Sequence, residues 1–127
     1  MKEMIQTLNA PQPSGPYSQG VKAGNLIFVS GQDGVHPNGE SAGESISAQA
    51  TASLENIKNI LAKQNAKLSD IVYVTCHLAE LNQENVSEFN EIYASYFKDV
   101  AVKPARITVG SKLLGVKVEI SAIASIG

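Results

Sequence analysis

The chain has 127 residues, a formal net charge of −2 and 43% hydrophobic residues, which fits one soluble domain that folds without a metal or a disulfide. Its basic residues are dispersed, so no basic surface for nucleic acid is predicted. A single cysteine excludes an internal disulfide, and no apolar run is long enough for a membrane span or a secretion signal. We therefore expect one domain over residues 1–127 and a cytoplasmic location.

The N-terminal part is predicted to be a short strand over residues 5–8, followed by an extended loop over residues 9–20. Three prolines and two glycines in this loop exclude a helix. Tyr17 lies near the end of the loop, just before apolar residues resume. Its side chain either lines a pocket or covers the edge of the core with its hydroxyl in water.

A β-hairpin is expected next, because apolar runs over residues 21–23 and 26–30 flank a turn-forming Gly-Asn pair. The second run is apolar at four successive positions, which predicts a strand buried on both faces. It ends in a Ser-Gly-Gln sequence, where Gly31 would let the backbone approach a ligand closely. A simple bulge or turn explains the same residues.

Two amphipathic helices are predicted from apolar residues that recur every three or four positions. The first spans residues 47–66, with Ser45 or Ser47 as its N-cap, and the second spans residues 85–97. Between them, residues 71–78 are rich in β-branched side chains and predict a strand. The apolar stripes of both helices are expected to pack on the sheet.

The histidines and the cysteine show no catalytic arrangement. Cys76 and His77 are adjacent in the predicted strand, so they point to opposite faces and cannot form a thiolate–imidazole pair. Cys76 shares its face with apolar residues, which is typical of an unreactive, structural thiol. His36 precedes a proline in a predicted loop, and we interpret it as solvated.

The only arginine of the chain, Arg106, lies in an apolar segment over residues 104–109 that predicts a strand. Alternation places Arg106 and Thr108 on the same face. A guanidinium presents a planar fork of donors that matches a carboxylate or a phosphate. A surface ion pair on an edge strand explains the arginine equally well at this point.

The last predicted strand covers residues 116–124, with Glu119 on its polar face. If this strand formed a hairpin with the preceding one, Arg106 would oppose Glu119 and Thr108 would oppose Lys117. The element order βββαβαββ predicts an α+β fold, with one six-stranded mixed sheet and two helices on a single face. Nothing in the chain would cover the other face, so a homo-oligomer is expected.

No nucleotide-binding, zinc or serine-nucleophile motif is present, so neither a cofactor nor a metal is expected. The remaining signals lie in a set of short segments spread along the chain: Asn9-Ala10-Pro11 with Gly15-Pro16-Tyr17-Ser18-Gln19-Gly20, Ser30-Gly31-Gln32, Asn90 with Tyr93, Pro104-Ala105-Arg106, and Val118-Glu119-Ile120. In this order and spacing, the chain resembles the reactive intermediate deaminase (RidA or YjgF) family over nearly its whole length. The resemblance implies a chorismate-mutase-like homotrimer, with a central β-barrel and three clefts between subunits.

The same resemblance implies hydrolysis of 2-imino acids, such as 2-iminopropanoate and 2-iminobutanoate, to 2-keto acids and ammonia without a cofactor. By position, Arg106 would hold the substrate carboxylate, and Gly31 would contact it through its backbone. Glu119 would position the attacking water, while Tyr17 and Asn90 would line the cleft.

This chain departs from the family pattern around the implied cleft. Thr108 stands where the family usually has cysteine, and it would still donate a hydrogen bond to the substrate. Asp33-Gly34 stand where an apolar residue and proline are common, and the loop over residues 110–115 is shorter than usual. Two other functions stay open: a non-catalytic trimer that binds a small carboxylate, and an endoribonuclease or translation inhibitor, which the acidic charge disfavours.

Overall fold

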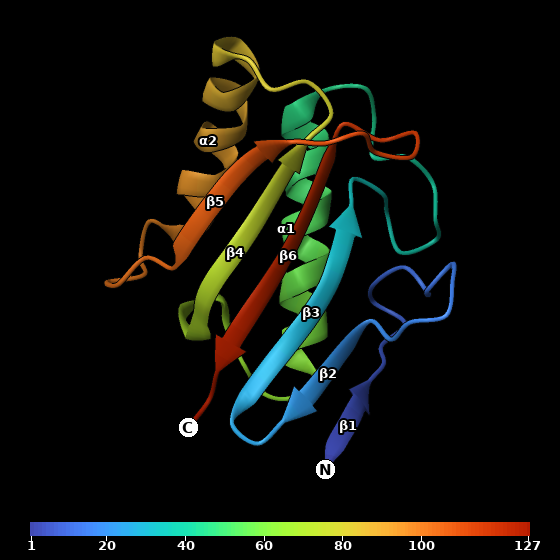
Figure 1. Cartoon of the computed structure of the whole chain (residues 1–127), viewed down its shortest axis with the longest axis vertical. Coiled ribbons are helices and arrows are strands. Elements are labelled where there is room, and N and C mark those ends of the chain that lie inside the picture. Colours follow the sequence, from blue (N-terminus) through green and yellow to red (C-terminus); the bar gives the residue numbers. More distant parts are fainter.

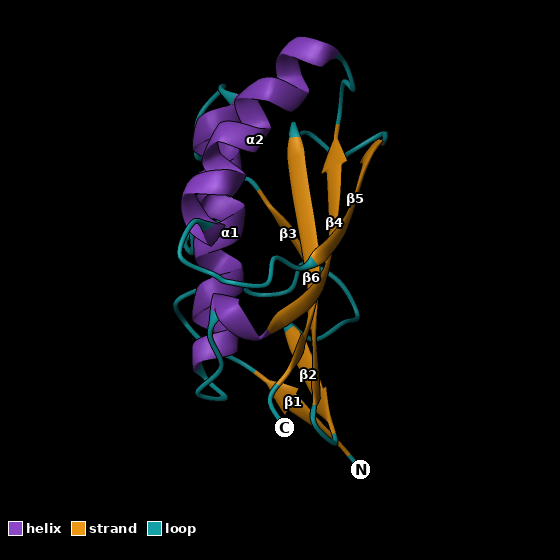
Figure 2. Cartoon of the chain, turned by 90° about the vertical axis from the view of Figure 1, so that its left-hand side faces the viewer, coloured by secondary structure: helices purple, strands orange, loops and turns teal.

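The computed structural model describes residues 1–127 as a six-stranded sheet with two helices on one face (Figures 1 and 2). The strands are β1 (Lys2–Ile5), β2 (Gly20–Ala23), β3 (Leu26–Asp33), β4 (Ile71–Leu78), β5 (Ala105–Gly110) and β6 (Val118–Ser125). The helices are α1 (Ile46–Ala62) and α2 (Gln83–Phe97), with a short 3₁₀ turn, η1 (Leu68–Asp70), before β4. The predicted fold class and element order are therefore confirmed.

Both long helices begin at side-chain caps and bury their apolar stripes against the sheet. The Ser45 hydroxyl accepts a hydrogen bond from the Ala48 N–H at the start of α1, and the Asn82 side chain caps α2 in the same way. Helix α1 ends four residues earlier than predicted. Asn65 adopts a positive φ of 56°, which an α-helix cannot continue through, and the Ala66 N–H bonds back to the Leu61 carbonyl.

The last strand lies in the middle of the sheet, so the C-terminal hairpin that the sequence left open does not form. The strand order is β1-β2-β3-β6-β4-β5, so β6 pairs antiparallel with both β3 and β4 (Figure 1). Strand β5 pairs in parallel with β4, because α2 carries the chain back to the starting end of the sheet. Arg106 therefore lies opposite Val74, not Glu119, and Thr108 lies opposite Cys76, not Lys117.

Two strand predictions also change. The first strand covers residues 2–5 instead of 5–8. In β3, Ile27 and Val29 are buried in the core, whereas Leu26 and Phe28 remain 40% and 41% exposed, so this strand is not buried on both faces of the single chain.

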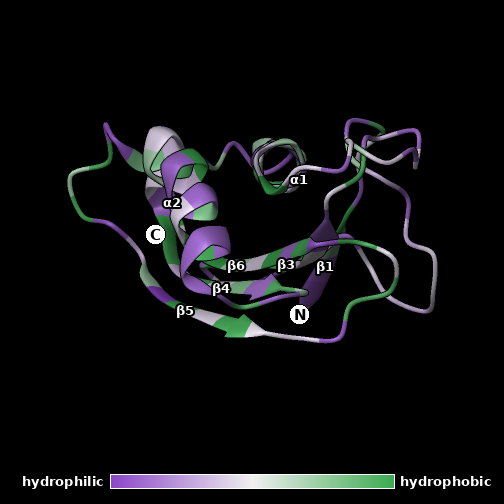
Figure 3. Cartoon of the chain, turned by 90° about the horizontal axis from the view of Figure 1, so that it is seen from above, coloured by the Kyte–Doolittle hydropathy of each residue, from purple (hydrophilic) through white to green (hydrophobic).

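The face of the sheet away from the helices is uncovered, as the side and top views show (Figures 2 and 3). One row of paired positions crosses all six strands of this open face and is almost entirely apolar: Met4, Val21, Phe28, Ile123, Tyr73 and Ala105. Nearer the other end of the sheet, the row through β3, β6 and β4 is polar, with Asp33, Glu119 and His77 side by side. An apolar band of this extent on an open sheet is typical of a surface that meets another protein.

Candidate functional site

The predicted site residues fall into two groups on opposite faces of the sheet. Parallel pairing with β4 places Arg106 and Thr108 on the face that the helices cover, together with Asn90 from α2. We call Asn90, Tyr93, Arg106 and Thr108 the helix-side half. Tyr17, Gly31, Asp33 and Glu119 line a cleft on the open face, and we call them the open-face half.

Aromatic rings of α2 hold the Arg106 guanidinium. Its central carbon lies 4.6 Å from the ring centre of Tyr93 and 5.9 Å from that of Phe89. Tyr93 in turn stacks on Phe97, with ring centres 4.6 Å apart. No carboxylate of the chain lies within 4.0 Å of the guanidinium nitrogens, so the surface ion pair left open by the sequence is absent. Cation–π contacts orient the arginine but leave its donor fork free for an external anion.

Three buried polar atoms around Arg106 lack a hydrogen-bond partner. They are Asn90 Oδ1, Tyr93 Oη and Thr108 Oγ1, and the chain contains only one other such side-chain atom, Ser53 Oγ. An unpaired buried polar group costs about 1–3 kcal/mol. Three of them beside an unpaired cation indicate a site whose partner comes from outside the chain. Asn90, Tyr93 and Arg106 line a small cleft of about 280 Å³ together with Lys103.

Burial suppresses the ionisation of the groups that pack behind Arg106. It raises the pKa of the Cys76 thiol to about 12, and the charge of Arg106 and the nearby Thr108 hydroxyl offset only part of that rise. Burial likewise raises the pKa of Tyr93 to about 12. The prediction of an unreactive Cys76 agrees with this environment, because a protonated buried thiol is a poor nucleophile.

The open-face half surrounds a cleft of about 540 Å³. Tyr17 comes from the proline-rich loop and is 50% exposed, and its hydroxyl accepts a hydrogen bond from the Ser14 N–H at 3.3 Å. Tyr17 therefore lines a cleft, the first of the two roles its sequence allowed. Lys112, from the loop between β5 and β6, provides a positive charge at the same cleft.

The Glu119 side chain packs closely against the backbone of Gly31. A Cβ atom at Gly31 would lie 2.8 Å from Glu119 Cδ and would overlap its Oε2. The pairing between β3 and β6 also shifts register between Val29 and Gln32, so a bulge presents Ser30 and Gly31 to the cleft. The glycine thus serves a close approach to the Glu119 side chain, whereas the Ser-Gly-Gln sequence indicated only a close backbone approach in general.

Sequence reasoning gave no role to three residues that the structure brings to these two halves. The helical spacing of Tyr93 predicts a core residue, yet its hydroxyl is one of the unpartnered atoms beside Arg106. Asp33 and His77 lie directly opposite Glu119 on its two neighbouring strands. Burial, and then the charge of Glu119, raise the pKa of Asp33. The only signal for Asp33 was its departure from the apolar residue common at that position.

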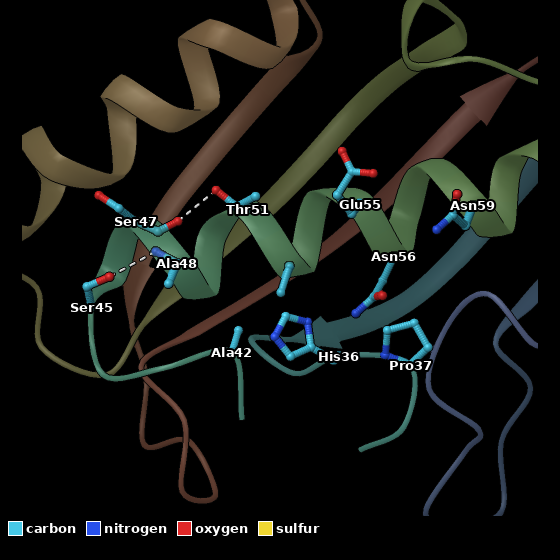
Figure 4. A pocket seen from close by; sticks show the side chains of 11 residues that line it. His36, Pro37, Ala42, Ser45, Ser47, Ala48, Thr51, Glu55, Asn56 and Asn59 are labelled. Carbon is cyan, nitrogen blue, oxygen red and sulfur yellow. Dashed lines mark hydrogen bonds between the residues drawn. The ribbon is translucent and has the colours of Figure 1, made fainter. Parts of the chain in front are cut away.

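A further cavity lies elsewhere, between the loop that carries His36 and α1 (Figure 4). It measures about 570 Å³ and has polar walls. Most of these polar groups already have partners within the chain: Asn56 donates to the Val35 carbonyl, Asn59 to the Asn9 carbonyl, and Glu55 accepts from Tyr96. We therefore place the candidate site at the two halves and not here.

The chain holds no group of three or more His, Cys, Asp or Glu side chains suited to a metal ion. Neither helix combines the length and apolar character that crossing a bilayer requires.

Comparisons with known proteins agree with one another. Residues 7–126 match the family model described as endoribonuclease L-PSP. A RutC family protein of Pyrococcus horikoshii is 45% identical over 127 residues, covering 98% of each chain. The chloroplastic Reactive Intermediate Deaminase A of Arabidopsis thaliana is 41% identical and covers 98% of this chain and 66% of the relative. The structure of E. coli TdcF with bound serine superposes with a TM-score of 0.90 at 36% identity, covering 98% of this chain and 99% of TdcF.

Proposed function

The chain belongs to the endoribonuclease L-PSP family, which includes the RutC and Rid proteins, and we propose that it hydrolyses reactive 2-imino acids to 2-keto acids and ammonia. The substrates we propose are small, such as 2-iminopropanoate and 2-iminobutanoate. A relative that is 41% identical bears the name of a reactive intermediate deaminase, which supports this class of reaction.

The observation that carries the proposal is the free guanidinium of Arg106 amid three unpartnered polar atoms. Every 2-imino acid carries a carboxylate beside the reacting carbon, and a bidentate arginine is suited to hold it. Asn90, Tyr93 and Thr108 would supply further hydrogen bonds. The related TdcF was solved with bound serine, which has the same carboxylate next to a nitrogen-bearing carbon.

Glu119 supplies the base. A protonated imine is already electrophilic, so a water oriented towards its carbon is sufficient for attack. The water oxygen forms a bond to the carbon, the C=N electron pair moves to nitrogen, and a water proton passes to the Glu119 carboxylate. Collapse of the resulting carbinolamine then breaks the C–N bond, releases ammonia and leaves the keto acid.

The proposed site is completed by a second copy of the chain. Arg106 and Glu119 lie on opposite faces of one sheet, so a single substrate cannot bridge them within one chain. In a homotrimer, the helix-side half of one subunit would meet the open-face half of the next, and the apolar row of the open face would be covered. Sedimentation at micromolar concentration should show a trimer, and a stable monomer would contradict this arrangement.

The activity is tested by following keto acid or ammonia release while a dehydratase generates 2-aminoacrylate, the enamine form of 2-iminopropanoate. The protein should accelerate release over buffer. Arg106→Lys should lower kcat/KM about 100-fold, because an ammonium lacks the bidentate fork, while the trimer persists. No acceleration by the wild-type protein would overturn the proposal.

Two other functions have specific support. The helix-side half would hold a small carboxylate even without catalysis, and calorimetry with 2-oxobutanoate beside the activity assay separates binding from turnover. The description of the family model favours an endoribonuclease. The net charge of −2 argues against an RNA groove, so RNA cleavage that survives repeated purification and Arg106→Ala would be needed to support it.

A further inference from the structure

We infer that Asp33 is a second proton-transfer residue of the open-face half, which shares a proton with Glu119 and delivers it to the leaving ammonia. The inference rests on the imine hydrolysis proposed above. Asp33 stands outside the residues to which the sequence pattern gave a role.

The register places the two carboxyl groups together. Asp33 on β3 lies directly opposite Glu119 on β6, and both side chains line the 540 Å³ cleft with Tyr17 and Lys112. Side chains directly opposite on one face of an antiparallel pair have Cβ atoms about 4.5–5.5 Å apart. Two carboxyl groups at such a separation do not ionise independently, because the first negative charge opposes the second.

The surroundings favour Asp33 as the protonated partner. Burial first, and then the charge of Glu119, raise the pKa of the Asp33 carboxyl. Gly31 leaves Glu119 room on its β3 side, where any larger residue would displace the carboxylate. When neighbouring environments separate the pKa values of two acids, the pair provides one acid and one base.

The other charged groups around the pair come from three elements. His77 on β4 lies opposite Glu119 on the side away from Asp33, and its Nδ1 is 2.8 Å from the Ser111 hydroxyl. Lys112, in the loop before β6, faces the cleft, and Tyr17 closes it from the N-terminal loop. The Lys112 side chain is the only cationic group among the residues that line this cleft.

Atoms, protons and electron pairs are conserved in the proposed step. Glu119 takes one proton from the attacking water, which converts the iminium ion to a neutral carbinolamine. Asp33 then donates its proton to the carbinolamine nitrogen, the C–N bond breaks with its electron pair leaving on ammonia, and the carbinol hydroxyl returns a proton to Asp33 as the carbonyl forms. Ammonia removes the proton from Glu119 and leaves as ammonium, so both carboxyl groups regain their starting states.

The test compares Asp33→Asn with Asp99→Asn, which removes the same charge at an exposed position just after α2. Asp33→Asn should lower kcat about 100-fold, in the range that general acids contribute. It should also remove the basic limb of kcat that ionisation of Asp33 would produce in the wild-type protein, because an amide has no proton to lose. Asp99→Asn should change neither, and Asp33→Glu should recover part of kcat.

Carbon-13 NMR titration of the carboxyl groups gives a readout that does not depend on turnover. The pKa of Asp33 should fall towards its ordinary value in Glu119→Gln and stay unchanged in Asp99→Asn, because the charge of Glu119 contributes to raising it. An active wild-type protein whose kcat and basic limb are unaffected by Asp33→Asn would overturn the role of Asp33 alone. A wild-type protein without imine hydrolysis would overturn the proposed function and with it the acid role, while the titration would still report whether the two carboxyl groups share a proton.

Discussion

The two halves of the candidate site differ in what holds them in place. The helix-side half is built from α2 and β5, where Arg106 rests on aromatic rings and its polar neighbours are buried. The open-face half is built from a bulge, a strand and two loops, and Tyr17 within it is 50% exposed. An anchor for a carboxylate gains from rigidity and desolvation, whereas groups that handle water and protons need access to solvent. The difference agrees with the proposal that the helix-side half binds the carboxylate and the open-face half carries out the reaction.

The largest effect is expected when the two halves are supplied by different chains. Arg106→Ala and Glu119→Gln should each lose at least 100-fold in activity. When the two variants are unfolded together and refolded as a random mixture, about one cleft in four should combine an intact Arg106 from one chain with an intact Glu119 from another. Activity should therefore recover to about a quarter of the wild-type value, measured by keto acid release.

The two variants refolded separately serve as the control for that experiment. If the mixture shows no more activity than either variant alone, then the two halves do not meet across a subunit boundary.

Gly31→Ala tests how closely the open-face half is packed. The added methyl group would displace the Glu119 carboxylate, so activity should fall at least 10-fold and stability by about 1–3 kcal/mol. Shortening the acid should relieve the overlap, so the double variant Gly31→Ala/Glu119→Asp should be more stable than Gly31→Ala. Urea denaturation of the wild-type protein, the variants Gly31→Ala and Glu119→Asp, and the double variant measures the coupling between the two positions. Strictly additive changes in the free energy of unfolding would show that the contact is absent.

Thr108→Val tests whether the unpartnered Thr108 hydroxyl contributes to ligand binding and not to stability. Removing an unpartnered buried hydroxyl should leave stability unchanged or raise it slightly, while affinity for 2-oxobutanoate should fall about 10-fold. Thr75→Val is the matched control on the open face, because the Thr75 hydroxyl bonds to the Ser121 hydroxyl and its loss should destabilise the fold by about 1 kcal/mol. Equal destabilisation by both variants would contradict a ligand-directed role for Thr108.

The smallest effect concerns Cys76 behind the helix-side half. The folded protein keeps the thiol protonated up to a pKa of about 12, whereas the unfolded chain loses the proton near 9.0. The unfolded state therefore binds fewer protons in this window, and stability should fall as pH rises from about 9 towards 12. The free energy of unfolding, measured by denaturation at about pH 8 and 10.5, should fall less in Cys76→Ala than in the wild-type protein. An identical fall in both proteins would show that another group titrates.

Local patterns in the sequence predicted the elements of the fold but not the partners of the last strands. Periodicity identified both helices, and alternation placed Arg106 and Thr108 on one face. The sequence left open a hairpin between the last two strands, which does not form. Alternation specifies the face of a side chain and carries no information on which strand lies beside it. Pairing of β5 with β4 depends on the path of α2 across the sheet, which is a property of the whole chain.

The candidate site could be predicted residue by residue only where a chemical type is rare or a family segment is matched. Arg106 is unique in the sequence, and Glu119 and Gly31 lie in matched segments. Tyr93 was taken for core because its ring is core and only its hydroxyl faces the site. Asp33 and His77 lie beside Glu119 only because of the register of three strands that are far apart in the sequence, so local patterns could not identify them.

The central position of β6 has a consequence for how the chain acquires its structure. Val118–Ser125 supplies the strand between β3 and β4, and its partner Leu26 lies almost the whole chain length away. During synthesis, β3 and β4 therefore have no strand to join them until this segment is available, so the sheet cannot form before it. Contacts of such large sequence separation also slow folding. Loss of these eight residues should leave a chain that cannot fold, since the missing piece is the middle of its sheet.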